Sequence, residues 1–244
     1  TGILITNESG GLAPGQHSFP RIAINNCRVG VSFGPSGNYL MFNCEQTTWG
    51  HVYMYDTVHG FMMNTQQGMG HYINYLSFNR AWTSGEHSAV LVANGGLLSI
   101  DHFFSYGTGV RVLKLLGPGP GNNNGMFTFR DIKFDDGAID AKLLDMTKWQ
   151  GSGSSTNPNM QVTFEDVKLC HEDYDSMVEP YLVDAYGGIK VNLNRVSKLQ
   201  RRAVRLRSSA GTDKPNLTMT NCTTWNTLVG QTGITGVVDS VLST

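Results

Sequence analysis

The stretch MFTFRDIKFDDG, residues 126–137, alternates apolar and polar side chains. Its three phenylalanines and its isoleucine occupy the apolar places, and the dipeptide Arg130-Asp131 interrupts the alternation once. A period of two predicts a β-strand that buries one face, because successive side chains of a strand point to opposite sides. The two charged residues therefore mark either a corner in the strand or a functional site.

Segments with the same pattern recur along the chain, on the frame apolar-x-apolar-x-polar-small/apolar. They are IAINNC (22–27), YLMFNC (39–44), LSFNRA (76–81), LSIDHF (98–103), FTFRDI (127–132), VTFEDV (162–167), VNLNRV (191–196) and LTMTNC (217–222). Their starts are 17 to 37 residues apart, mostly within the range of solenoid repeats. Weaker strand-like segments lie between them, so we expect two or three short strands in each repeat.

Such repeats bury their apolar faces by stacking, each strand pairing in parallel with its neighbours about 4.8 Å away. The composition agrees with a turn-rich all-β protein, since 29 residues are glycine and only 15% are charged. A β-sandwich or jelly roll also has many short strands and is the alternative architecture.

Through these eight segments, over roughly residues 20 to 240, the chain resembles the right-handed parallel β-helix family. This is the pectate-lyase-like group, which includes bacteriophage tailspikes and depolymerases. The resemblance implies an all-β fold, a right-handed single-stranded parallel β-helix of about eight rungs with variable loops. We expect a lead-in segment at residues 1–20 and the β-helix domain at residues 21–244, as part of a longer chain.

The fourth or fifth place of every segment holds Asn or Asp. These residues are Asn25, Asn26, Asn43, Asn79, Asp101, Asp131, Asp166, Asn194 and Asn221. Asn and Asp tolerate a left-handed backbone better than other residues with a side chain. The column therefore predicts a sharp corner, and Arg130-Asp131 belongs to it. The fifth place alone reads Asn26, Asn43, Arg80, His102, Asp131, Asp166, Arg195 and Asn221.

The same column contains candidate catalytic residues. If the rungs stack in register, Asp131 and Asp166 lie roughly 5 Å apart, a separation typical of retaining glycosidases. Two carboxylates so close would raise one pKa and create an acid beside a base, with His102 and Arg195 beside them. Asp135, Asp136 and Asp140 form a second acidic group, with Asp135 and Asp136 as candidate catalytic residues and a solvated turn as the alternative. The Gly-His-Gly motif of polygalacturonases is missing, so their mechanism is not carried over.

Trp49, Trp82 and Trp149 are predicted to stack on sugar rings, because aromatic faces suit apolar sugar C–H groups. Further aromatic candidates are Tyr53, Tyr55, Tyr72, Tyr75 and Tyr106. Buried plugs or an oligomer interface would explain the same residues. Arg205 and Arg207 share one strand face and are predicted to bind carboxylates of an acidic polysaccharide. The alternative pairs this basic strand with the acidic stretch at residues 165–179.

A net charge of -1 and a pI near 6.6 favour neither nucleic acid nor an anionic membrane as partner. No apolar run approaches the roughly 20 residues that span a bilayer, and no metal or cofactor motif is present, so neither group is predicted. The resemblance implies a homotrimeric, virion-attached or extracellular protein that contacts other virion proteins and binds bacterial surface polysaccharide. It leaves open whether the glycan is cleaved. Two alternatives are a free polysaccharide lyase or glycoside hydrolase and a non-catalytic structural fibre.

Overall fold

The computed structural model describes most of the chain. The described residues are 2–5, 17–34, 41–44, 46–63, 65–68, 70–79, 87–93, 95–107, 109–116, 124–135, 141–147, 159–169, 181–197, 203–207, 214–222 and 239–241. Every regular element within these ranges is a β-strand. The prediction of an all-β protein is confirmed.

The strands form two large sheets and one small one. The nine-stranded sheet contains β2 (His17–Asn25), β5 (Thr47–Tyr55), β8 (His71–Asn79), β10 (Gly96–Ser105), β12 (Asn124–Phe134), β14 (Asn159–Leu169), β16 (Lys190–Ser197), β18 (Asn216–Thr220) and β19 (Asp239–Val241). The eight-stranded sheet contains β1 (Ile3–Ile5), β3 (Val29–Phe33), β6 (His59–Met63), β9 (His87–Val92), β11 (Val110–Leu115), β13 (Lys142–Asp145), β15 (Tyr181–Tyr186) and β17 (Ala203–Arg207). The small sheet pairs β4 (Met41–Cys44) with β7 (Thr65–Gly68).

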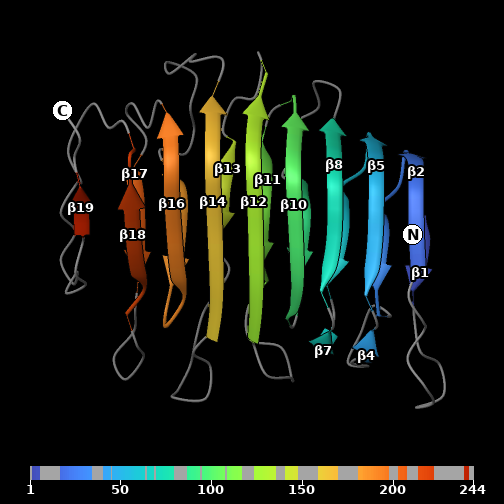
Figure 1. The fold of residues 1–244 in the computed structure, drawn as a ribbon, viewed down its shortest axis with the longest axis horizontal. Coiled ribbons are helices and arrows are strands. Elements are labelled where there is room, and N and C mark those ends of the chain that lie inside the picture. The colour runs from blue at the N-terminus through green and yellow to red at the C-terminus, as the bar shows by residue number, and fades with distance from the viewer. Residues whose placement is uncertain are drawn as a thin grey trace.

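The chain alternates between the two large sheets, so that β12 of one is followed by β13 of the other and then by β14 of the first. Figure 1 shows the nine-stranded sheet in front and the eight-stranded sheet behind it. All pairings among the described strands are parallel. This arrangement fits a parallel β-solenoid, and the sandwich alternative is wrong because those folds pair their strands antiparallel.

Five of the eight predicted segments stack in the predicted frame. Leu98 pairs with Phe127, and the same place continues through Val162 and Val191 to Leu217. The apolar residues of FTFRDIKF are all buried in the core. The rings of Phe129 and Phe164, at the third place of adjacent strands, stack with centroids 5.3 Å apart.

The first three segments were predicted in the wrong frame. Leu76 pairs with Phe103 rather than with Leu98, and residues 41–44 belong to the small sheet. The frame in β2, β5 and β8 is instead HSFPRI (17–22), TTWGHV (47–52) and HYINYL (71–76). It escaped the sequence pattern because the first place of these segments holds histidine or threonine.

Two of the polar groups at this first place, on Thr47 and His71, contact each other inside the core. Thr47 Oγ1 lies 2.7 Å from His71 Nδ1 and accepts a hydrogen bond from Trp49 Nε1 at 2.8 Å. The His71 ring stacks on Phe33 with centroids 4.1 Å apart. Such pairing lowers the cost of placing polar residues in the core, and the buried ring nitrogen His71 Nε2 has no hydrogen-bond partner among the described residues near it.

Strands also begin inside the predicted lead-in segment. Ile3–Ile5 pairs with β3, and β2 starts at His17. The division into a lead-in and a β-helix domain stays a prediction.

His71 predicts an acid-sensitive core. Burial lowers the pKa of His71 from 6.5 to about 4, so the unfolded chain takes up a proton that the folded chain resists between these pH values. Stability therefore falls as the pH drops from about 6.5 towards 4, by up to about 3 kcal/mol. Urea unfolding at several pH values would measure this loss. The variant His71→Gln should lose less stability over the same interval, and an equal loss in both proteins would contradict the assignment to His71.

Candidate functional site

The fifth place of the frame forms a column of polar side chains on the outer face of the nine-stranded sheet. In strand order it reads Arg21, His51, Tyr75, His102, Asp131, Asp166, Arg195 and Asn221. All of them are exposed or half-buried. The corrected frame replaces the predicted Asn26, Asn43 and Arg80 with Arg21, His51 and Tyr75; Arg80 lies outside the described residues. We call this set the fifth-place column.

The predicted left-handed corner residue is confirmed at Asp131, Asp166 and Asn221, whereas on β16 it is Arg195 and not the predicted Asn194. Asp131, Asp166, Arg195 and Asn221 have φ angles of 42°, 55°, 52° and 52°, in the left-handed region. Arg130 pairs with Glu165, and the register resumes with the residues after the two aspartates. Two successive side chains therefore point outward, which explains why the alternation in FTFRDI is interrupted.

The structure has a second corner, which the sequence pattern did not distinguish from the first. Asn26 and Asp56 also have positive φ angles, of 56° and 49°. They follow the ends of β2 and β5, where the Asn26 amide donates to the Tyr55 carbonyl. Asn26 therefore belongs to the turn that leads into β3 and not to the fifth-place column.

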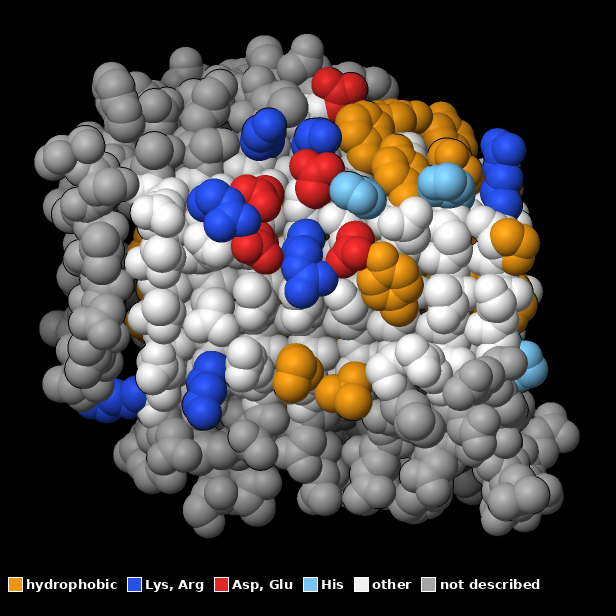
Figure 2. All heavy atoms as spheres, viewed as in Figure 1, with side chains coloured by type: hydrophobic (Ala, Val, Ile, Leu, Met, Phe, Trp, Pro, Cys, Tyr) orange, Lys and Arg blue, Asp and Glu red, His pale blue; other side chains and the backbone are white. Residues whose placement is uncertain are grey.

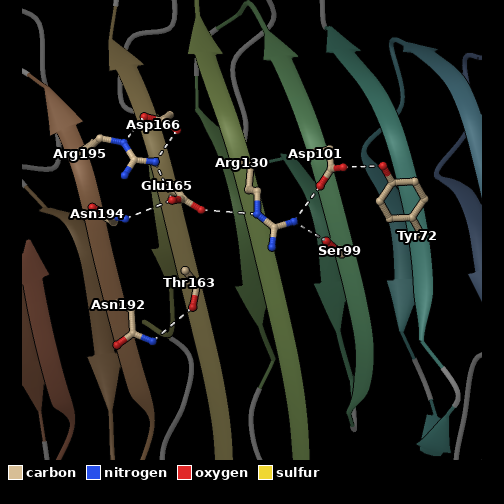
Figure 3. A network of polar contacts seen from close by, with 10 residues as sticks. All are labelled: Tyr72, Ser99, Asp101, Arg130, Thr163, Glu165, Asp166, Asn192, Asn194 and Arg195. Carbon is tan, nitrogen blue, oxygen red and sulfur yellow. Dashed lines mark hydrogen bonds and ion pairs between the residues drawn. The ribbon is translucent and has the colours of Figure 1, made fainter.

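Charged side chains of opposite sign alternate across four adjacent strands (Figure 3). Arg130 lies between Asp101 and Glu165, with nitrogen–oxygen distances of 2.8 and 3.4 Å. Arg195 lies between Glu165 and Asp166, at 2.6 Å from each. We call these five residues the ion-pair row. Each carboxylate has a guanidinium partner, so the row is a preformed network on a rigid sheet.

Tyr72 extends the ion-pair row onto β8. Its hydroxyl donates a short hydrogen bond to the Asp101 carboxylate, and this bond raises the pKa of Tyr72. Ser99 accepts a weaker hydrogen bond from Arg130 at 3.4 Å. The row thus joins neutral hydroxyl groups to the charged residues.

Asp131 and Asp166 occupy equivalent places on adjacent strands, as predicted, but each has its own cationic partner. His102 Nδ1 lies 2.9 Å from Asp131 Oδ2, and Lys133 Nζ lies 3.3 Å away. The hydrogen bond from His102 lowers the pKa of Asp131, and that from Arg195 lowers the pKa of Asp166. The expectation that one of the two pKa values is raised is wrong, because nearby cations stabilise both carboxylates. A catalytic role for either aspartate stays a prediction, without the expected acid–base asymmetry.

The second acidic pair is described only in part. Asp135 follows β12, and its backbone amide donates to the Ser105 carbonyl at 3.0 Å. Asp136 lies outside the described residues, as do Trp82 and Trp149. The roles predicted for these residues remain predictions.

Trp49 does not lie on the surface. It is fully buried, and its indole ring stacks on Phe19 with centroids 4.2 Å apart. The prediction that Trp49 stacks on a sugar is wrong, because both its ring and its N–H group are engaged in the core. The alternative, a buried plug, describes it correctly.

Arg205 and Arg207 share a face of β17, as predicted, and both bind the fully buried Asp184. Arg205 donates to one carboxylate oxygen of Asp184, and Arg207 Nε donates to the other at 2.8 Å. The guanidinium of Arg205 lies over the Tyr181 ring, 4.3 Å from its centroid. Drawing these arginines onto a ligand would leave a buried carboxylate unpaired, at high cost. The structure favours the alternative of an internal basic face and gives Asp184 as its partner; residues 170–179 of the acidic stretch lie outside the described residues.

Exposed aromatic residues gather next to the charged residues. His51, Tyr53 and Tyr55 alternate with buried residues in β5, and Tyr75 lies opposite His51 on β8. Tyr53 and Tyr55 are 38% and 41% exposed, and the ring centroids of His51, Tyr53 and Tyr75 are 5.7 to 6.5 Å apart. We call these four residues the aromatic patch. Figure 2 shows the hydrophobic patch beside histidines and the charged cluster.

The sequence analysis names these tyrosines individually but does not predict that they lie side by side. The signal was present in TTWGHVYMY (47–55), where every second residue after Gly50 is aromatic. It was overlooked because this segment was not aligned with the other repeats. Parallel pairing then places His102 of the next strand beside Tyr75, which joins the patch to the His102–Asp131 pair.

A third feature of this face is a row of small polar groups at the second place of the frame. It consists of Ser18, Thr48, Tyr72, Ser99, Thr128, Thr163, Asn192 and Thr218. Asn192 donates to Thr163 Oγ1 at 3.2 Å. We call it the hydroxyl row, since seven of its eight members carry a hydroxyl group.

Comparison with known proteins gives no relative: no family model, no curated protein and no solved structure matches this chain. Within the described ranges, no helix is long and apolar enough to cross a membrane. The same residues contain no group of three or more metal-ligating side chains. The candidate site therefore rests on the fifth-place column and its neighbours alone.

Substitutions at Asp166 separate its backbone role from its charge. Asp166→Asn keeps tolerance of positive φ and loses an exposed ion pair, so the free energy of unfolding should fall by no more than about 1 kcal/mol. Asp166→Val places a β-branched residue in the left-handed region and should cost about 1–3 kcal/mol more. Urea unfolding of both variants would measure the difference. Equal losses would show that the charge, and not the corner, is what this position requires.

Proposed function

We propose that this chain is a bacteriophage tailspike-like protein that recognises a bacterial surface polysaccharide on the outer face of its nine-stranded sheet. The observation that carries the proposal is the aromatic patch, which lies exposed beside the ion-pair row and the hydroxyl row. Monomeric proteins rarely expose contiguous apolar surface without a binding function. The sheet beneath is held by a continuous core, so the groups that meet the ligand are already ordered.

The chemistry of this face matches a sugar chain. Tyrosine rings offer apolar faces for sugar C–H groups and hydroxyls for sugar oxygens, and they lose little conformational entropy on binding. The hydroxyl row supplies donors and acceptors at a spacing of about 4.8 Å, one per strand. A glycan crossing the strands would meet such a group at every step.

The finer architecture is part of the proposal. We propose a right-handed single-stranded β-helix of about eight rungs, supported by the alternation of the chain between two parallel sheets. Crossovers between parallel strands are right-handed in nearly all proteins. We also propose a homotrimer on a virion tail or otherwise extracellular, in contact with other virion proteins, on the basis of the family resemblance. Sedimentation should give a mass three times that of the chain, and a monomer would exclude the trimer.

Recognition is better supported than cleavage. A glycosidase needs one carboxyl group that is protonated near neutral pH, whereas hydrogen bonds from cationic side chains lower the pKa of both Asp131 and Asp166. Degradation of the bound glycan, as by a lyase or hydrolase, is the second function, and its candidates are the four aspartates predicted above. A structural fibre without ligand is the third.

Tyr75 provides the test of glycan recognition. Because it lies between His51 and His102 in register, Tyr75→Ala should weaken binding to bacterial polysaccharides on an array by about 1–3 kcal/mol, which is about 5- to 150-fold in affinity. Leu116→Ala, which removes an exposed apolar residue after β11, is the control and should bind like the wild type. Analysis of released sugars would detect cleavage. Absence of binding to every polysaccharide would leave the structural fibre as the function.

A further inference from the structure

We infer that the glycan recognised by the aromatic patch is uncharged. The inference rests on the proposed function and adds the class of substrate. This class is a neutral polysaccharide, in place of the acidic one that was predicted to bind Arg205 and Arg207. It follows from how the cations and carboxylates of this face are already paired.

Two arginines beside the patch already contact other side chains of this face. Arg21 lies over the Tyr53 ring, 5.4 Å from its centroid. Arg130 contacts Asp101, Ser99 and Glu165, as described above. A ligand carboxylate that approached Arg130 would have to displace Asp101 or Glu165, which are pre-positioned and therefore cost less to hold than a flexible ligand.

Fixed carboxylates also border the patch. His102 is the neighbour of Tyr75 on the next strand, and its Nδ1 faces the Asp131 carboxylate. Asp101 accepts a hydrogen bond from Tyr72 on the same strand as Tyr75. An anionic sugar stacked on Tyr75 would approach these carboxylates, and like charges disfavour binding strongly where water is excluded.

Neutral hydroxyl groups meet no such penalty. Carboxylate oxygens accept hydrogen bonds from sugar hydroxyls while keeping their own cations, because an ionised carboxylate offers about four acceptor positions. The tyrosine rings contribute apolar contact that does not depend on ligand charge. The carboxylates of Asp101 and Asp131 beside Tyr75 therefore disfavour an anionic sugar there and accept a neutral one.

Ligand charge and salt together test the inference. Bacterial polysaccharides of both classes would be presented on one array, each neutral one also after oxidation of its primary alcohols to carboxylates, and each acidic one also after carboxyl reduction. We expect neutral polysaccharides to bind, and oxidation to lower their affinity at least about tenfold. Raising NaCl from about 50 to about 500 mM should change the affinity less than about twofold, since no charge pair forms.

The outcomes separate this inference from the proposed function. Binding of acidic polysaccharides that salt weakens and Tyr75→Ala abolishes would overturn the neutral class and leave the site intact. Binding that Tyr75→Ala and Tyr53→Ala leave unchanged would overturn the site. Carboxyl-reduced forms that bind more tightly than their acidic parents would support the inference, and Leu116→Ala again serves as the control. Absence of binding to any polysaccharide would overturn the proposed function and the inference together.

Discussion

Parallel pairing between successive repeats is the constraint on which the rest of this structure depends. Each strand of the nine-stranded sheet satisfies its backbone groups through its neighbours, and the first, third and sixth places of the frame then fall in line as one core. A register slip by one residue would turn this core outward. The same pairing aligns the outward places, so any feature repeated in sequence becomes a row on the surface.

The rows on the outer face are aligned by the same register that aligns the core. At Arg130-Asp131 and at Glu165-Asp166 two successive residues point outward and the second is left-handed, a conformation that Asp adopts at little cost. The extra outward place brings charged groups side by side on neighbouring strands. Alternation of sign across the ion-pair row then makes the native register more favourable than one that opposes like charges. The network thus both specifies the stack and orders the face beside the aromatic patch.

Prediction succeeded where the repeats were apolar and failed where they were not. In five segments hydrophobic residues occupy the inward places of the frame, and the stacking and buried faces of these segments were predicted correctly. They are LSIDHF, FTFRDI, VTFEDV, VNLNRV and LTMTNC. HYINYL was missed because a buried histidine bonded to Thr47 replaces an apolar residue. Because of this error, the wrong residues were predicted for the N-terminal half of the fifth-place column, and the aromatic patch was not predicted. Trp49 was misassigned for the same reason, since only the correct frame shows it at an inward place.

By itself, the sequence determined that this is an all-β protein of stacked parallel strands with a corner at Asp131 and Asp166, because hydrophobic period and left-handed preference are local properties. Only the tertiary structure decided which residues meet across strands. It paired Asp131 with His102 and Asp166 with Arg195, and it set Arg205 and Arg207 against the buried Asp184. These contacts join residues 21 to 29 positions apart, and their partners depend on register, which spacing along a chain with loops of variable length does not specify.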